Sequence, residues 1–218
     1  MSILAPSILN ADNMKLGQEI QEAADNGITR FHLDIMDGHF VPNLSYGPEL
    51  VAAFKKNFPD LTAEVHLMSN NLAVTIPLFV EAGADLIEFH IESTDKVEEW
   101  LDYLQAHHVK AGLAISPETP VEELQLYLNK IDQILVMSVK PGFGGQTFNS
   151  ETPTRIKKIR QMLKENNLEI PIEVDGGIDD QTVKKVKAAG AEIFVAGSYI
   201  FKKGSIAQQI QKLEEAAE

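Results

Sequence analysis

The chain has 218 residues, a formal net charge of −13 and no cysteine. The lack of cysteine excludes disulfides, thiolate catalysis and cysteine-based zinc sites, and the acidic balance argues against nucleic acids and anionic membranes as partners. An anionic small substrate remains compatible, because a metal, backbone N–H groups or helix N-termini can make a pocket locally positive. Without a signal-peptide pattern, or a run near the about 18 apolar residues of a membrane span, we expect a cytoplasmic protein.

Short apolar runs alternate with amphipathic segments from one end of the chain to the other. The apolar runs predict strands at residues 3–8, 28–35, 61–67, 84–91, 109–115, 133–139, 170–175 and 191–196. The amphipathic segments predict helices to about residue 25, over 48–57, up to Gly83, around Trp100, after Thr119, over about 151–166, up to Gly190 and from Ser205.

Several helix starts carry capping signals. Asn10 or Asp12 can cap the first helix, and Asp179 can cap the helix that ends at Gly190. Thr119 as N-cap, Pro120 at the first helical position and Glu122 at the third predict a capping box for another helix.

Eight strand–helix units follow one another without a linker or a change in composition. This pattern indicates an α/β fold, a single-domain (β/α)₈ barrel over residues 1–218. A doubly wound open sheet is the alternative. Eight strands are less usual there, and the dinucleotide fingerprint is absent after the first strand.

The segment 31–43 organises the prediction of function. Its strand alternates, so His32, Asp34 and Met36 share the face opposite the apolar side chains. The Asp37-Gly38 step then ends the strand. Taken alone, the segment fits equally well a buried His–Asp hydrogen bond that only fixes the fold and a strand end that carries chemistry.

In a barrel the carboxyl ends of the strands form the active face. The polar groups expected there are Ser7, His32, Asp34, His66 and Asp175. Two imidazoles and two carboxylates suit a divalent metal, with zinc as the first choice and Mn, Fe(II) or Co as alternatives. Three side chains are expected to line the pocket beside it, although methionine is more often core filler: Met36, Met68 and Met137.

The roles of Ser7 and His90 stay open at this point. Ser7 could be a hydrogen-bonded core hydroxyl. His90 shares a strand face with Glu88 and Glu92, and we expect it to support the site or the core rather than to act as a ligand.

Glycine-rich segments follow the sixth, seventh and eighth strands. They are Gly142-Phe143-Gly144-Gly145, Gly176-Gly177 and Gly197-Ser198. Glycine lets backbone N–H groups approach an anion closely, and barrels often bind phosphate with the loops after strands seven and eight. Three such segments on consecutive strands favour a phosphate site over plain turns.

Four motifs resemble the ribulose-phosphate 3-epimerase family: residues 32–43, His66-Leu67-Met68, residues 137–146 and residues 174–178. The similarity extends from Ala5 to Ser198 and implies interconversion of D-ribulose 5-phosphate and D-xylulose 5-phosphate in the pentose phosphate pathway. Lys140 is a departure, at a position where relatives often carry Asn or Glu.

The resemblance also implies roles for individual residues. The metal ligands would be His32, Asp34, His66 and Asp175, with Asp34 as proton acceptor and Asp175 as proton donor. The substrate-binding residues would be Ser7, His66, Gly142, Phe143, Gly144, Gly145, Asp175, Gly176, Gly177, Gly197 and Ser198.

The chemistry of the residues agrees with this reaction. Inverting a carbon next to a ketone needs an acid/base group on each side, and Asp34 and Asp175 come from well-separated strands. The intermediate is an ene-diolate, whose charge a metal can stabilise. Four protein ligands would fill a tetrahedral site. When substrate oxygens bind, the metal must therefore expand its coordination or a carboxylate must dissociate from it.

Other functions remain as alternatives. A related decarboxylase class carries Asp-x-Lys-x-x-Asp, but Met36 occupies the lysine position here. D-allulose 6-phosphate is an alternative substrate, and a metal-dependent hydrolase or a non-catalytic phosphosugar-binding barrel are alternative classes. We also expect a homo-oligomer.

Overall fold

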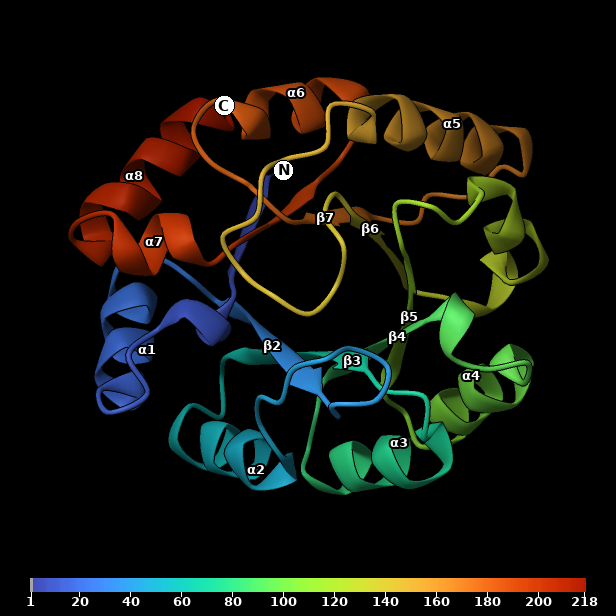
Figure 1. Ribbon diagram of the computed structural model, residues 1–218, viewed down its shortest axis with the longest axis horizontal. Coiled ribbons are helices and arrows are strands. Elements are labelled where there is room, and N and C mark those ends of the chain that lie inside the picture. Colours follow the sequence, from blue (N-terminus) through green and yellow to red (C-terminus); the bar gives the residue numbers. More distant parts are fainter. Residues whose placement is uncertain (1) are drawn as a thin grey trace.

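A computed structural model describes residues 2–218. Within them, eight parallel strands form one sheet in the order β1-β8-β7-β6-β5-β4-β3-β2, and helices surround it (Figure 1). An isolated parallel bridge between Ser7 and His32 joins the two ends of the sheet. The predicted (β/α)₈ barrel is therefore confirmed. Its strands are Ile3–Pro6 (β1), Arg30–Met36 (β2), Thr62–Met68 (β3), Leu86–His90 (β4), Lys110–Ile115 (β5), Gln133–Met137 (β6), Ile172–Asp175 (β7) and Ile193–Ala196 (β8).

The outer layer consists of α-helices and short 3₁₀ segments. The α-helices are Leu16–Asp25 (α1), Pro48–Asn57 (α2), Leu72–Glu81 (α3), Val97–Ala106 (α4), Thr152–Glu165 (α5), Thr182–Ala189 (α6), Ser198–Lys202 (α7) and Ile206–Ala216 (α8). The 3₁₀ segments are Ile8–Asn10 (η1), Ile91–Ser93 (η2), Val121–Leu126 (η3) and Leu128–Lys130 (η4). In residues 2–218, no helix is both long and apolar enough to cross a membrane.

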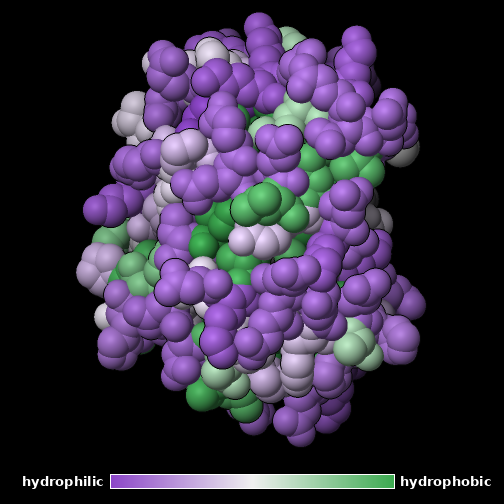
Figure 2. Space-filling model, turned by 90° about the vertical axis from the view of Figure 1, so that its right-hand side faces the viewer, coloured by the Kyte–Doolittle hydropathy of each residue, from purple (hydrophilic) through white to green (hydrophobic). Residues whose placement is uncertain are grey.

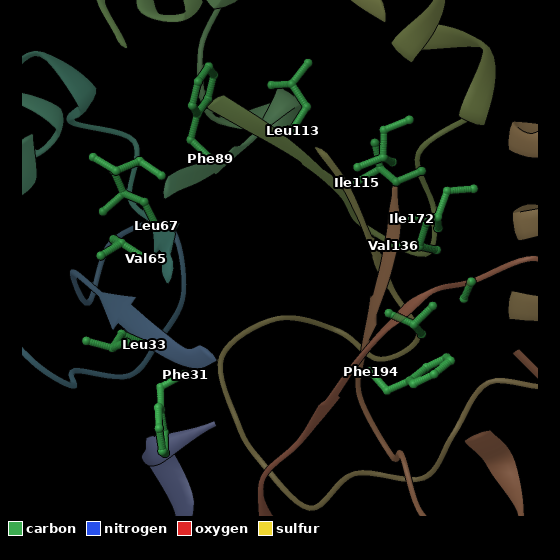
Figure 3. Packing of buried hydrophobic residues seen from close by; sticks show 14 of the residues in the cluster. Phe31, Leu33, Val65, Leu67, Phe89, Leu113, Ile115, Val136, Ile172 and Phe194 are labelled. Carbon is green, nitrogen blue, oxygen red and sulfur yellow. The ribbon is translucent and has the colours of Figure 1, made fainter. Parts of the chain in front are cut away.

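The main apolar core lies between the strands and the helices. Alternate strand residues point outward from the barrel, as Phe31, Leu67, Phe89 and Phe194 do in Figure 3. These four side chains are fully buried. The opposite strand faces turn inward, so the polar residues of β2, β3 and β7 are directed into the barrel.

Truncating one of these outward-facing side chains should destabilise the fold. Phe89→Ala would leave a cavity at a site with no exposed surface, so we expect the free energy of unfolding to fall by about 3–5 kcal/mol. Urea denaturation followed by circular dichroism would measure the loss. Leu126→Ala is the matched control, because Leu126 is 82% exposed and its truncation should change stability by less than about 0.5 kcal/mol.

The predicted cap of the first helix is wrong. Neither Asn10 nor Asp12 caps α1; its N-cap is Lys15, without a side-chain cap. Asn10 instead ends the 3₁₀ segment η1, and the Asp12 carboxylate accepts a hydrogen bond from the Met14 N–H. By contrast, the predicted start of the last helix at Ser205 is confirmed, and the Ser205 hydroxyl caps α8 by accepting from the Gln208 N–H.

The predicted capping box after Thr119 is also wrong. The segment forms the 3₁₀ turns η3 and η4, and Pro120 is its N-cap, with an extended ψ of 133°. The Thr119 hydroxyl donates to Glu92 instead of accepting from a backbone N–H. The Thr119 side chain therefore bonds to a carboxylate that is distant in the sequence instead of capping the helix that the local pattern predicts.

Hydrophilic side chains cover most of the face over α4 and α5, around an apolar area between these helices (Figure 2). Several large apolar side chains elsewhere on the surface are exposed too, among them Met14 at 92% and Leu44 at 73%.

Candidate active site

Strand register brings the predicted acidic and imidazole groups together. Asp34 on β2 pairs with His66 on β3, and Asp175 at the end of β7 pairs with Met137 on β6. One potential ligand atom each from His32, Asp34, His66 and Asp175 lies within 4.8 Å of the others. The inward-facing alternation of strands far apart in the sequence thus builds one cluster.

Close contacts with His66 and Ser7 fix the carboxylate of Asp34 in this cluster. Its Oδ1 lies 3.0 Å from the His66 Nδ1, and its Oδ2 accepts a hydrogen bond of 2.5 Å from the Ser7 hydroxyl. Ser7, Asp34 and His66 are all buried. Ser7 therefore contacts the acidic group directly from β1, across the closure of the barrel.

The imidazole of His32 has one nitrogen that is engaged and one that is not. Its Nδ1 lies 3.0 Å from the Glu64 Oε1, a carboxylate, and so carries the proton. Its Nε2 is buried without a hydrogen-bond partner among residues 2–218 and lies 3.5 Å from the Asp34 Oδ1. A buried orphan imidazole nitrogen beside carboxylates is what a divalent cation would satisfy. The His₂Asp₂ cluster could therefore hold a metal ion.

The two carboxyl groups of the cluster have different electrostatic surroundings. Burial would raise the pKa of Asp34, but the charge of His32 and the contacts of His66 outweigh it and lower this pKa below its usual range. Burial, and then the charge of Asp34, raise the pKa of Asp175 to about 7. Two carboxyl groups whose pKa values are pushed apart are typical of an acid/base pair.

The two imidazoles also differ. Burial disfavours the imidazolium of His32, yet the charge of Asp34 and hydrogen bonds to nearby carboxylates raise its pKa well above its usual value. Burial, with the charge of His32 as a further cause, lowers the pKa of His66 to about 4. The surrounding carboxylates therefore favour positive charge at the centre of the cluster, while His66 stays neutral.

A pocket opens above the cluster at the carboxyl ends of the strands. Figure 1 shows the loop between β6 and α5, in yellow, crossing the centre of the barrel. The pocket lining includes these sequence-predicted residues: Ser7, Asp34, Met36, Met68, Met137, Gly142, Phe143, Gly144, Gly145, Asp175, Gly176, Gly177, Gly197 and Ser198. His32 and His66 do not line it, because they are fully buried beneath its floor.

Close backbone approach explains two of the lining glycines. Gly177 has a φ of +63°, and a Cβ there would lie 2.7 Å from the backbone nitrogen of Phe148. A Cβ on Gly197 would lie 2.5 Å from the Asn10 Oδ1. Gly177 needs glycine because of its backbone conformation and its contact with the Phe148 backbone, whereas a side chain at Gly197 would have to displace Asn10.

Two groups of residues at the site do not follow from the sequence prediction. Asn10, a predicted helix cap, lines the pocket and lies against Gly144 and Gly197. Beneath the cluster, a buried polar layer fills the barrel interior: Glu64, Glu88, Gln133 and Glu173. The strand alternation that selects His66 and Asp175 also places Glu64 and Glu173 on the inward face. This alternation could therefore have predicted the two buried glutamates.

Fold and site together define a class: a (β/α)₈ enzyme barrel with a buried His/Asp cluster, which could bind a metal, below a glycine-rich pocket. The chain matches the family model described as "Ribulose-phosphate 3 epimerase family" over residues 3–201. It belongs to this family, and a sugar-phosphate substrate is implied by that membership.

Curated relatives cover nearly the whole chain. A ribulose-phosphate 3-epimerase from Chlamydia muridarum is 43% identical over 94% of this chain and 90% of its own length. One from Buchnera aphidicola is 40% identical over 99% of this chain and 94% of its own. One from Escherichia coli K12 is 40% identical over 91% of this chain and 88% of its own.

More distant solved structures share the fold. A crystal structure of a 3-hexulose-6-phosphate synthase superposes with a TM-score of 0.75 at 20% identity, covering 99% of this chain and all of that one. A 3-keto-L-gulonate-6-phosphate decarboxylase from Vibrio cholerae gives a TM-score of 0.73 at 14% identity, covering 99% of this chain and 97% of that one. At these identities the likeness shows the barrel alone.

Proposed function

We propose that this protein interconverts D-ribulose 5-phosphate and D-xylulose 5-phosphate by proton transfer at C3. The observation that carries the proposal is the pair Asp34 and Asp175, which lie in one His/Asp cluster on strands β2 and β7. Membership of the family supports the same reaction.

In this proposal, Asp34 and Asp175 each act once as base and once as acid. Asp34, whose pKa is lowered, is ionised and removes the C3 proton; Asp175, whose pKa is raised to about 7, delivers a proton to the opposite face. In the reverse direction the roles exchange. The Ser7 hydroxyl, at 2.5 Å from the Asp34 Oδ2, orients the base and stabilises its negative charge before the proton is removed.

The proposed cofactor is one divalent ion held by His32, Asp34, His66 and Asp175, with zinc as the first choice and Mn, Fe(II) or Co as alternatives. The donor set and the orphan Nε2 of His32 support this choice. When bound, the ion would act as a Lewis acid toward the negative charge that develops on the substrate oxygens. The buried methionines Met36 and Met68 would keep water away from the reacting carbon.

The decisive experiment is proton NMR of D-ribulose 5-phosphate mixed with the protein and a divalent metal. Xylulose 5-phosphate should appear, and D-allulose 6-phosphate in a parallel sample should react far more slowly. Preferential conversion of the hexulose would move the assignment to the allulose 6-phosphate epimerase alternative, and no conversion of either sugar would contradict an epimerase.

The phosphate group of the substrate is proposed to bind at Gly144, Gly177, Gly197 and Ser198, which line the pocket and whose backbone N–H groups would be the donors to the anion. Free ribulose should therefore have a kcat/KM at least about 100-fold below that of the 5-phosphate, because it lacks the anchoring anion. Gly197→Val should raise KM for the ester, since its side chain would displace Asn10. Steady-state kinetics measures both effects, and equal kcat/KM for the free and phosphorylated sugars would show that these glycines are only turns.

The expected homo-oligomer remains a prediction. Exposed apolar side chains such as Met14, Leu44 and Leu126 are compatible with contacts between copies of the chain. Sedimentation velocity would check it, and a monomer at micromolar concentration would contradict it.

A further inference from the structure

A chain of hydrogen bonds runs outward from His66, away from Asp34. The Nε2 of His66 lies 2.9 Å from the Nε2 of His90, and the Nδ1 of His90 lies 3.1 Å from the Glu92 Oε2. Both imidazoles are fully buried, and Phe40 covers His90 with ring centroids 4.9 Å apart. This chain, from His66 through His90 to Glu92, links the candidate metal cluster to the loop after β4.

The contacts of Glu92 determine which atom donates at each step of this hydrogen-bond chain. The Glu92 Oε1 accepts hydrogen bonds from the Thr119 hydroxyl and, at 2.7 Å, from the Ser116 N–H. Burial would raise the pKa of Glu92, but the hydrogen bond from His90 and these donors lower it to about 2. An ionised carboxylate only accepts hydrogen bonds, so the Nδ1 of His90 must be the donor. The Ser116 hydroxyl, at 3.5 Å from this Nδ1, is too far to compete.

The surrounding loop holds these donors in place. The Arg155 guanidinium on α5 donates to the backbone oxygens of Ser116 at 2.9 Å, Pro117 at 3.0 Å and Thr119 at 2.8 Å. The segment that supplies both partners of the Glu92 Oε1 is therefore tied to a helix, which keeps the carboxylate oriented toward His90.

The donor at His90 Nδ1 then determines the donor and acceptor roles of both imidazoles up to the His/Asp cluster. With its Nδ1 donating to Glu92, His90 offers the lone pair of its Nε2, so the Nε2 of His66 is the donor between them. A neutral His66 with its proton on Nε2 has a bare lone pair on Nδ1. That lone pair lies 3.0 Å from the Asp34 Oδ1, where two acceptors face each other and only a cation between them makes the contact favourable.

We propose that His90 and Glu92 are positioning residues, which fix the tautomer of His66 so that its Nδ1 presents a lone pair to a metal ion beside Asp34. The inference rests on the metal dependence proposed above. Metal-ligating histidines usually donate their other N–H to a carboxylate or carbonyl. His32 does so directly to Glu64, whereas His66 reaches its carboxylate through a second imidazole.

Two measurements on the zinc-loaded full chain test the proposal. Long-range ¹H–¹⁵N correlation spectra should show His90 protonated at Nδ1, which is the less common tautomer of a free histidine side chain. They should show His66 protonated at Nε2. Competition with a chromophoric chelator should show that His90→Phe weakens zinc binding by about 10- to 100-fold, because the His66 N–H loses its acceptor. Glu92→Gln should weaken zinc binding less, because its amide oxygen can still accept from His90.

The controls separate this proposal from a general loss of structure. Glu123→Gln removes a charge from the exposed surface of η3 and should bind zinc as the wild type does. Thermal unfolding of the metal-free variants shows whether each one folds, and the wild-type spectra do not depend on any variant. Unchanged zinc affinity in folded His90→Phe, or a His90 protonated at Nε2, would overturn this inference alone. A wild type that binds no divalent ion would overturn the metal proposal and this inference together.

Discussion

Asp34→Asn and Asp175→Asn should each lower kcat in both directions by about 10³-fold or more, because an amide can neither accept nor deliver the C3 proton. Each carboxylate serves as base in one direction and as acid in the other, so neither substitution should spare one direction. Asp60→Asn is a matched control, since Asp60 is exposed in the turn between α2 and β3 and should leave kcat unchanged. Retention of normal turnover by either site variant would remove that residue from the proposed pair.

Isotope incorporation sharpens the same prediction. With two bases, the proton delivered to the product comes from solvent, so in D₂O the product should carry deuterium at C3 from its first appearance. Substrate recovered at low conversion should contain much less deuterium, unless the first carboxylic acid exchanges its proton quickly. One asparagine variant can still exchange the C3 proton of one epimer, because a single base suffices for that half-reaction. The C3 proton integral measures this by NMR, and product that retains its original hydrogen would point to a single relay group.

Removal of the divalent ion is the second change with a large expected effect. Chelation followed by desalting should lower kcat by about 10³-fold, because the charge on the substrate oxygens loses several kcal/mol of stabilisation. Adding back zinc, manganese, iron(II) or cobalt should restore the rate, and the ion that restores it best identifies the preferred metal. Metal analysis of the sample and the rate measured in parallel provide the test.

A ligand variant separates the metal from other effects of chelation. His66→Ala should lower both the metal content and the rate, since His66 supplies a ligand atom to the cluster. His107→Ala removes an exposed imidazole at the end of α4 and should change neither quantity. Full activity in a sample verified to be metal-free would contradict the metal dependence, whatever the variants do.

The sequence by itself determined the fold class and most of the cluster. Alternation along β2 placed His32 and Asp34 on one strand face, and the same periodicity selected His66 and Asp175. Parallel strands in a barrel bring their carboxyl ends to one face, so membership of the cluster follows from local pattern plus topology. The glycine segments could be found in the same way, because their composition is a local property.

Tertiary structure decided which partner each polar side chain takes. Thr119 has a perfect local capping signal, yet its hydroxyl donates to Glu92, and Asn10 lies against Gly197 instead of capping a helix. The sequence left open whether His90 supports the site or the core, and the tertiary structure decides this by placing its Nε2 within 2.9 Å of the His66 Nε2. A local backbone N–H and a distant carboxylate compete for a hydrogen bond with the same side chain. Which partner the side chain takes depends on distances between strands and loops far apart in the sequence, and no local pattern contains these distances.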